Sequence, residues 1–196
     1  MRVLGIDPGL RITGYACLEL AAGVTAFGAM PRIVEAGVFR LSRNEPVRKL
    51  TGGEASPGAN LGAIEVARRT KKAGAASVSA RLLELDRDFA ELLARVKPEV
   101  LAVEAIFAHS KHPATSIIMA HARGVLLLNG RRAGLRLVEL RPATVKKALT
   151  GNGQAAKGQM QRAVQERFKL AELPSPPDLA DALAIALCAM ERIGVA

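Results

Sequence analysis

Short apolar runs and helical repeats alternate along this chain, which is the pattern of a sheet covered by helices. Runs rich in apolar and β-branched residues predict five strands, at Val3–Ile6, Thr13–Glu19, Ile33–Leu41, Val100–Val103 and Leu135–Leu140. The first three follow one another without a helix, so we expect an antiparallel meander, with a loop over Ala21–Met30. The last two alternate with helices, which favours a mixed sheet.

Helical spacing dominates the rest of the chain. Leu85, Phe89 and Leu92 recur at helical spacing up to Pro98, while polar residues, Arg81 and Arg87 among them, fill the other face of this surface helix. Further helices are predicted at Thr115–Leu128, Pro142–Leu149, Ala155–Leu170 and Asp178–Ile193, with Gly130 as the stop of the first. The pattern predicts an α/β fold in one domain of 196 residues.

Residues 42–76 interrupt this pattern and are rich in Gly, Ala, Ser and basic residues. We interpret them as a basic insertion, with room for one short helix near Gly62–Arg69. It lacks apolar periodicity, so it can stay loose and become ordered on a polyanion. A solvated loop of no consequence is the alternative. Its predicted DNA-binding residues are Arg48, Lys49, Arg68, Arg69, Lys71 and Lys72.

The net charge of +10 and the pI of about 10.3 point to a polyanionic partner. Nucleic acid is the leading interpretation; a merely basic protein and one that touches anionic lipid are the alternatives. Aromatic residues make up only 3% of the chain, so phosphate contacts should dominate over base stacking.

Other features limit where the protein works. No apolar run approaches the roughly 20 residues of a membrane span. The segment after Met1 lacks the pattern of a signal peptide. Cys17 and Cys188 are too few for a disulfide framework or a zinc site. We therefore expect a cytoplasmic protein that does not enter a membrane.

Two carboxylates stand at the carboxyl ends of apolar strands. Asp7 follows the first strand and Glu104 follows the fourth. Open α/β sheets place their sites at this edge, so the two would converge if the strands are parallel neighbours. Taken alone, each could also be a turn-forming acid that faces solvent.

Two more carboxylates, Asp178 and Asp181, lie three residues apart at the head of the last helix and share one face. Acids in a first turn also meet the helix dipole favourably, which is the alternative. Asp181, however, continues into the apolar stripe of Ile185 and Cys188. Four acids that converge without basic residues would suit Mg²⁺, and two such ions clamp an in-line phosphoryl displacement.

Four sequence blocks in order closely resemble the RuvC family of Holliday junction resolvases. They are Arg2-Val3-Leu4-Gly5-Ile6-Asp7-Pro8-Gly9, Val103-Glu104-Ala105-Ile106-Phe107, Ala122-Arg123-Gly124-Val125, and the run from Asp178 to Ala186. The resemblance implies an RNase H-like (retroviral-integrase-like) mixed sheet flanked by helices. It also implies paired symmetric nicks across a four-way DNA junction in homologous recombination and DNA repair, by a homodimer with two active sites.

The resemblance also implies roles for individual residues. Asp7, Glu104, Asp178 and Asp181 would be the catalytic acids and hold two Mg²⁺ per subunit, with Mn²⁺ as a substitute. Lys146 and Lys157 resemble basic active-site residues of the family, which would hold the scissile phosphate or stabilise its developing charge. Phe107 resembles an aromatic residue that the family uses against bases at the crossover. Solvated lysines and a core phenylalanine are the alternatives. We add Lys111, Arg123 and Lys147 as DNA contacts, and the RuvAB branch-migration complex as a partner.

Three rival functions follow from the same residues. Another RNase H-like nuclease would act on a different nucleic acid. An actin-like ATP-binding domain also opens with an Asp-x-Gly turn, but that fold needs two such domains. A silent DNA-binding module would have no reason to retain four acids.

The predicted helix Thr115–Leu128 bears on oligomeric state. Its apolar residues, Ile117 and Leu128 among them, cover more than one face. The surplus predicts a two-fold interface, and complete burial within the monomer is the alternative.

Overall fold

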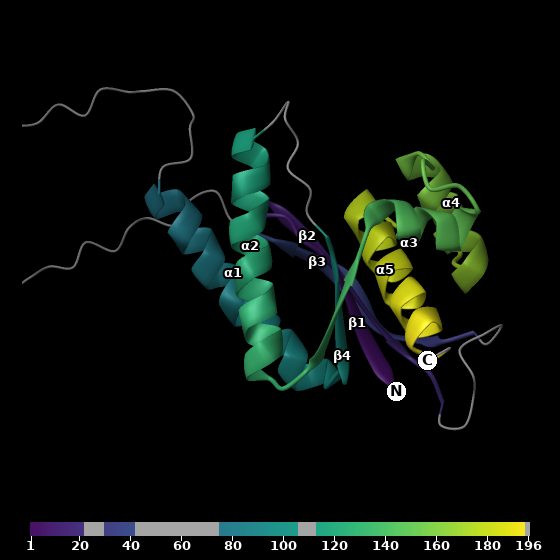
Figure 1. The fold of residues 1–196 in the computed structure, drawn as a ribbon, viewed down its shortest axis with the longest axis horizontal. Helices are drawn as coiled ribbons and strands as arrows, with labels where there is room; N and C mark the ends of the chain where they lie inside the picture. Colours follow the sequence, from purple (N-terminus) through teal and green to yellow (C-terminus); the bar gives the residue numbers. More distant parts are fainter. Residues whose placement is uncertain (22–29, 42–74, 106–112, 195–196) are drawn as a thin grey trace, which may run out of the picture.

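The computed structural model describes residues 1–21, 30–41, 75–105 and 113–194. Five strands form one sheet in the order β3-β2-β1-β4-β5 (Figure 1). They are β1 (Arg2–Asp7), β2 (Ile12–Glu19), β3 (Arg32–Arg40), β4 (Val100–Glu104) and β5 (Arg136–Leu140). The meander β1-β2-β3 is antiparallel, and β4 and β5 run parallel to β1. The predicted mixed sheet is confirmed.

Helices cover both faces of this sheet. Their bounds are α1 (Ala75–Val96), α2 (Pro113–Arg132), α3 (Pro142–Thr150), α4 (Lys157–Phe168) and α5 (Pro177–Ile193). On one face α1 and α2 cover the sheet with a cluster that includes Phe89, Leu101 and Leu126. On the other face α5 lies on the sheet, with α3 and α4 packed beside it (Figure 1). The sheet therefore separates two apolar cores.

The expected stop of α2 at Gly130 is wrong. The helix continues to Arg132, and a left-handed residue, Gly134 at φ +72°, follows it. Gly130 is buried against the sheet instead, where a Cβ would lie 2.5 Å from a methyl carbon of Leu101. The glycine is needed for this close approach of helix and sheet.

The expected place of Arg81 on the polar face of α1 is also wrong, since this side chain is only 7% exposed. Arg81 precedes Leu85 by four residues and Phe89 by eight, so it extends the buried stripe of the helix. There the Arg81 side chain lines a cavity.

Glycines let α5 lie directly on the sheet. A Cβ at Gly5 in β1 would come within 2.4 Å of the backbone nitrogen of Ala186 and 2.5 Å of the carbonyl oxygen of Ala182. A Cβ at Gly14 in β2 would come within 2.0 Å of the carbonyl oxygen of Asp178. Backbone-to-backbone contact thus fixes the first turn of α5 over β1 and β2.

Two further sequence predictions concern the basic insertion and the absence of a membrane span. Of the proposed insertion over residues 42–76, only the last two fall within the described residues, where they begin α1. Among the described helices, none is long and apolar enough to cross a membrane.

Candidate active site

Asp7 and Glu104 lie side by side at one edge of the sheet. Strands β1 and β4 are parallel neighbours, with Ile6 opposite Val103, so the next residues on each are Asp7 and Glu104. The two carboxyl groups interact directly, and this interaction helps to raise the pKa of Asp7. The parallel register of β1 and β4 therefore brings the two strand ends together, as predicted.

The turn after Asp7 is held by the side chain of Thr13. The hydroxyl of Thr13, which is fully buried, accepts a hydrogen bond from the Gly9 amide at 3.2 Å and donates one to the Gly9 carbonyl. A Cβ at Gly9 would lie 2.1 Å from the Ile12 carbonyl oxygen, so only glycine fits there. The tight turn leaves Asp7 at the open edge of the sheet.

Asp178 and Asp181 come to the same edge from the other core. They occupy the first turns of α5, which begins after cis-Pro176 and has Pro177 at its first position. Because the Asp178 carbonyl rests on Gly14, the helix head cannot move away from β2 without losing this contact. All four acids are half-buried.

The charges of these carboxylates oppose one another. Burial first, and then the negative charges of Glu104, Asp181 and Asp178, raise the pKa of Asp7 well above its ordinary value. Burial also raises the pKa of Glu104 and of Asp181. The site therefore holds more negative charge than its own surroundings stabilise.

Two lysines offset part of this charge. Lys157 and Lys146 act to lower the pKa values of both Asp181 and Glu104. Lys146 belongs to α3 and Lys157 is the first residue of α4, so neither is close to the acids in sequence. The expectation that the four acids converge without basic residues is therefore wrong, because two lysines lie near them in the fold.

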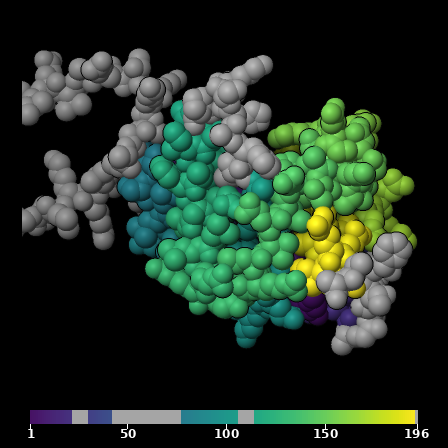
Figure 2. Space-filling model, in the orientation of Figure 1, coloured from purple at the N-terminus to yellow at the C-terminus, as the bar shows by residue number. Residues whose placement is uncertain are grey.

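The acids and lysines line one cavity of about 770 Å³. One wall comes from α3, α4 and α5, and the other from α1, α2 and the turn between β1 and β2. In the space-filling view these two sets of helices form the two halves of the molecule (Figure 2). Apolar residues, among them Leu10, Ile118 and Met160, complete the lining.

The donor set fits a hard divalent cation. It offers carboxylate oxygens from three elements, with raised pKa values that report uncompensated negative charge. Among the described residues no three acids, histidines or cysteines already stand at the close spacing of a metal cluster.

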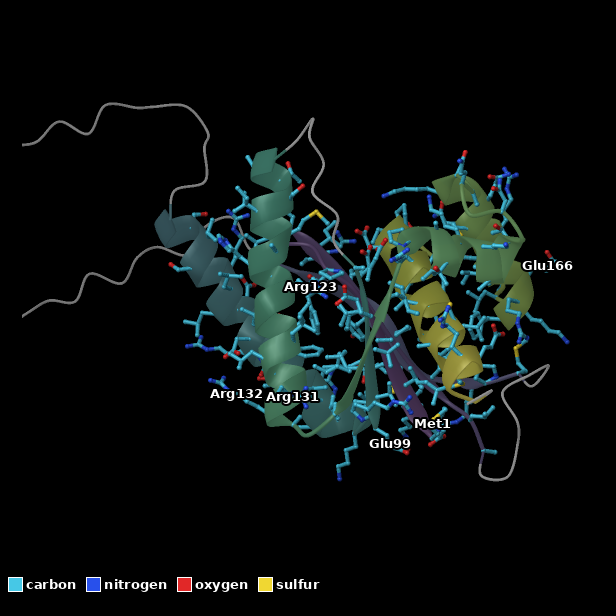
Figure 3. All side chains as sticks on the ribbon, in the orientation of Figure 1. Met1, Glu99, Arg123, Arg131, Arg132 and Glu166 are labelled. Carbon is cyan, nitrogen blue, oxygen red and sulfur yellow. The ribbon has the colours of Figure 1, made fainter. Side chains whose placement is uncertain are left out.

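Arg123, which was predicted to contact DNA, makes its contacts within the protein. It lies between α2 and the sheet (Figure 3), with a side chain 18% exposed. Its guanidinium pairs with Glu139 and donates to the Glu104 carbonyl oxygen at 3.3 Å. These contacts tie α2 to the end of β4.

The other predicted DNA contacts lie away from this cavity or outside the description. Lys147 is exposed on α3 and lines a separate shallow pocket with Thr144 and Gly153. Phe107 and Lys111 fall outside the described residues, as do the six basic residues Arg48, Lys49, Arg68, Arg69, Lys71 and Lys72. Their roles stay predictions.

Two charged residues of the cavity were not predicted as site residues, namely Arg11 and Arg81. Arg81 could have been found from its place on the stripe of Leu85 and Phe89, where a charged residue is out of pattern. Arg11 follows the Asp7 turn, and nothing in the sequence around it marks it.

Comparison with known proteins gives the family. A sequence model described as "Crossover junction endodeoxyribonuclease RuvC" matches residues 58–189. The chain belongs to the RuvC family. The RuvC of Rhodopirellula baltica is 34% identical over 188 residues, which cover 95% of this chain and 84% of that protein. The RuvC of Caldicellulosiruptor saccharolyticus is 35% identical, over 96% and 91% of the two chains.

Solved structures agree with the RuvC assignment. Thermus thermophilus RuvC superposes with a TM-score of 0.71 at 26% identity, over all of this chain and 96% of that one. A second structure, T. thermophilus RuvC in complex with Holliday junction substrate, gives 0.73 at 27% identity, with the same coverage. The yeast mitochondrial resolvase Ydc2 shares the fold at 14% identity, with a TM-score of 0.55.

Family and fold together confirm two predictions. The chain has the RNase H-like α/β fold of the RuvC resolvases. It is a nuclease of the RuvC family, whose members depend on metal.

Proposed function

We propose that this chain resolves four-way DNA junctions by paired symmetric nicks, in homologous recombination and DNA repair. The observation that carries the proposal is the single cavity that joins Asp7, Glu104, Asp178 and Asp181 to Lys146 and Lys157. The relatives are named crossover junction endodeoxyribonucleases, and T. thermophilus RuvC was solved with a Holliday junction substrate. The net charge of +10 suits such a polyanion.

The four carboxylates would hold Mg²⁺, with two ions per subunit and Mn²⁺ as a substitute. When bound, such cations make a water nucleophilic near neutral pH and neutralise charge on the phosphate. A P–O bond forms to the water oxygen while the bond to the leaving ester oxygen breaks. Lys146 and Lys157, which line the same cavity and lower the pKa of Asp181, would hold the phosphate oxygens and stabilise the charge that develops there.

A homodimer is the second part of the proposal, because two symmetric nicks need two sites. Helix α2 supports it: Ala122 and Leu126 are buried, but Ile117 is 57% and Leu128 49% exposed. A groove of mainly apolar residues runs between α1 and α2 on this side. Burial within one subunit is thus incomplete. Partnership with the RuvAB complex and a cytoplasmic location belong to the same proposal and rest on the family.

Cleavage of defined substrates tests the function. The wild-type chain with Mg²⁺ should cut a four-way junction faster than a three-way junction, a flap or an RNA–DNA hybrid. Asp7→Asn and Asp181→Asn should each slow cleavage by about a hundredfold or more while junction binding persists. Asp88→Asn, an acid of α1 outside the cavity, is the matched control and should cut normally.

Two results would contradict this assignment. Turnover at the wild-type rate in both cavity variants would remove the carboxylates from the chemistry. Faster cleavage of the hybrid than of the junction would favour another RNase H-like nuclease.

A further inference from the structure

Arg81 is the one charged side chain among the described residues that is buried outright, at 7% exposure. It folds back along its own helix, where Nε donates to the Ser77 carbonyl oxygen at 3.0 Å and Nη2 to the Ser77 hydroxyl at 2.9 Å. Both contacts lie within one turn of α1, so the guanidinium is fixed relative to the helix.

Unlike the other arginines that are not exposed, Arg81 has no acidic partner in the described part of the chain. Four described arginines are not exposed, and the other three pair with glutamate: Arg2 with Glu19, Arg123 with Glu139 and Arg167 with Glu191. Burying an unpaired cation is costly, and this cost is recovered when an anion binds it.

Arg81 lines the same cavity as the four carboxylates, but from the opposite wall. Lys146 and Lys157 come from α3 and α4, on the side of the sheet covered by α5. Arg81 comes from α1, on the other side, and the exposed Arg11 lines the same cavity. The acidic edge therefore lies between two separate cationic groups.

We propose that Arg81, together with Arg11 of the same cavity, binds a backbone phosphate that flanks the scissile phosphate on the DNA strand that is cut. The inference rests on the proposed nuclease function, since the ligand is the strand that enters the cavity. The lysines on the far wall hold the scissile phosphate, and the arginines hold a flanking one. A guanidinium presents two parallel donors to a phosphate, which fixes its orientation as well as its position.

A single substitution on α1 tests the site. Arg81→Met keeps the unbranched stem of the side chain and removes the guanidinium, and Arg87→Met on the exposed side of α1 is the matched control. Binding to a four-way junction is measured without divalent cation over a series of salt concentrations. Arg81→Met should bind about tenfold or more weakly, and the slope of log affinity against log salt should fall by about one. Arg87→Met should match wild type.

A purely structural role for Arg81 predicts the opposite pattern. Arg81→Met would then unfold at lower denaturant concentration, while the affinity of the folded protein and its salt slope stay those of wild type. That outcome overturns the proposal.

Neutral phosphate analogues locate the contact even if Arg81→Met does not fold. Single methylphosphonate linkages are placed one at a time on either side of the cut. One flanking linkage should weaken wild-type binding, and the same linkage should cost less in Arg81→Lys, which keeps the charge but loses the paired donors. Equal losses in both proteins at every linkage would overturn the proposal.

Junction cleavage and phosphate binding by Arg81 can be lost separately. A wild-type chain that binds the junction but never cuts it refutes the proposed function and leaves the phosphate site intact. A wild-type chain that cuts, beside an Arg81→Met variant with unchanged affinity and salt slope, refutes the phosphate site alone.

Discussion

Among single residues, Asp7 lies where burial and three neighbouring carboxylates all disfavour its negative charge. Its folded pKa is raised above the unfolded one, so its favourable contribution to folding is present at low pH. That contribution is lost as pH rises through the folded pKa. Without a divalent cation, the native chain should therefore become less stable between acid and neutral pH on account of this group.

Asp7→Asn should remove that loss. An amide resembles the protonated carboxyl group, so without metal at pH 7 the variant should be at least as stable to denaturant as wild type. Added Mg²⁺ should stabilise wild type more than the variant, because it binds the native carboxylates. Denaturant unfolding at pH 5 and pH 7, with and without Mg²⁺, measures both effects.

Glu172→Gln, an exposed acid outside the cavity, controls for the loss of one charge. A clear loss of stability in metal-free Asp7→Asn at neutral pH would show that Asp7 serves the fold as an anion.

Sequence reasoning at this scale succeeded where local pattern decides position. Asp7 and Glu104 end apolar runs, so their places at strand ends could be predicted, and the parallel register did the rest. Arg81 was misplaced, because the strong apolar signal of α1 led us to count every charged residue as solvent-facing. Whether a charge on the buried stripe meets solvent or a cavity depends on where the neighbouring elements end.

At the scale of elements, the position of α5 depends on close backbone contact with β1 and β2. Gly14→Ala would place a methyl group 2.0 Å from the Asp178 carbonyl oxygen, so the head of α5 must shift. Overpacking of this kind typically costs about 1–3 kcal/mol. We expect lower stability in denaturant and slower junction cleavage, since Asp178 and Asp181 move with the helix.

Gly158→Ala is the control, because a Cβ there meets nothing within 4 Å. Normal cleavage by a folded Gly14→Ala chain would show that the acids tolerate displacement of α5.

The requirement for Gly14 could not be predicted from the sequence. The atom that excludes a side chain belongs to Asp178, more than 160 residues further along. The same holds for Gly130. The local pattern marked it as a helix stop, but it lies inside α2, where Leu101 leaves no room for a side chain. Helices and strands were predictable from periodicity, and their close contacts were not.

At the scale of the whole molecule, the exposed apolar residues of α2 bear on assembly. We expect wild type to sediment as a dimer at micromolar concentration and Leu128→Glu to shift toward monomer, because a charge would be buried at the interface. Leu173→Glu is the matched control, since Leu173 is 47% exposed and precedes α5. A wild-type monomer, even with junction DNA present, would contradict the dimer.

The order of the acids along the chain has a consequence for protein synthesis. Asp7 and Glu104 are made early, but Asp178 and Asp181 belong to α5, the last described helix. That helix is buried along most of its length and reaches its place only when the sheet beneath it has formed. A nascent chain still on the ribosome, or a product of interrupted translation, therefore lacks half of the acids. Such fragments should leave the chromosome uncut.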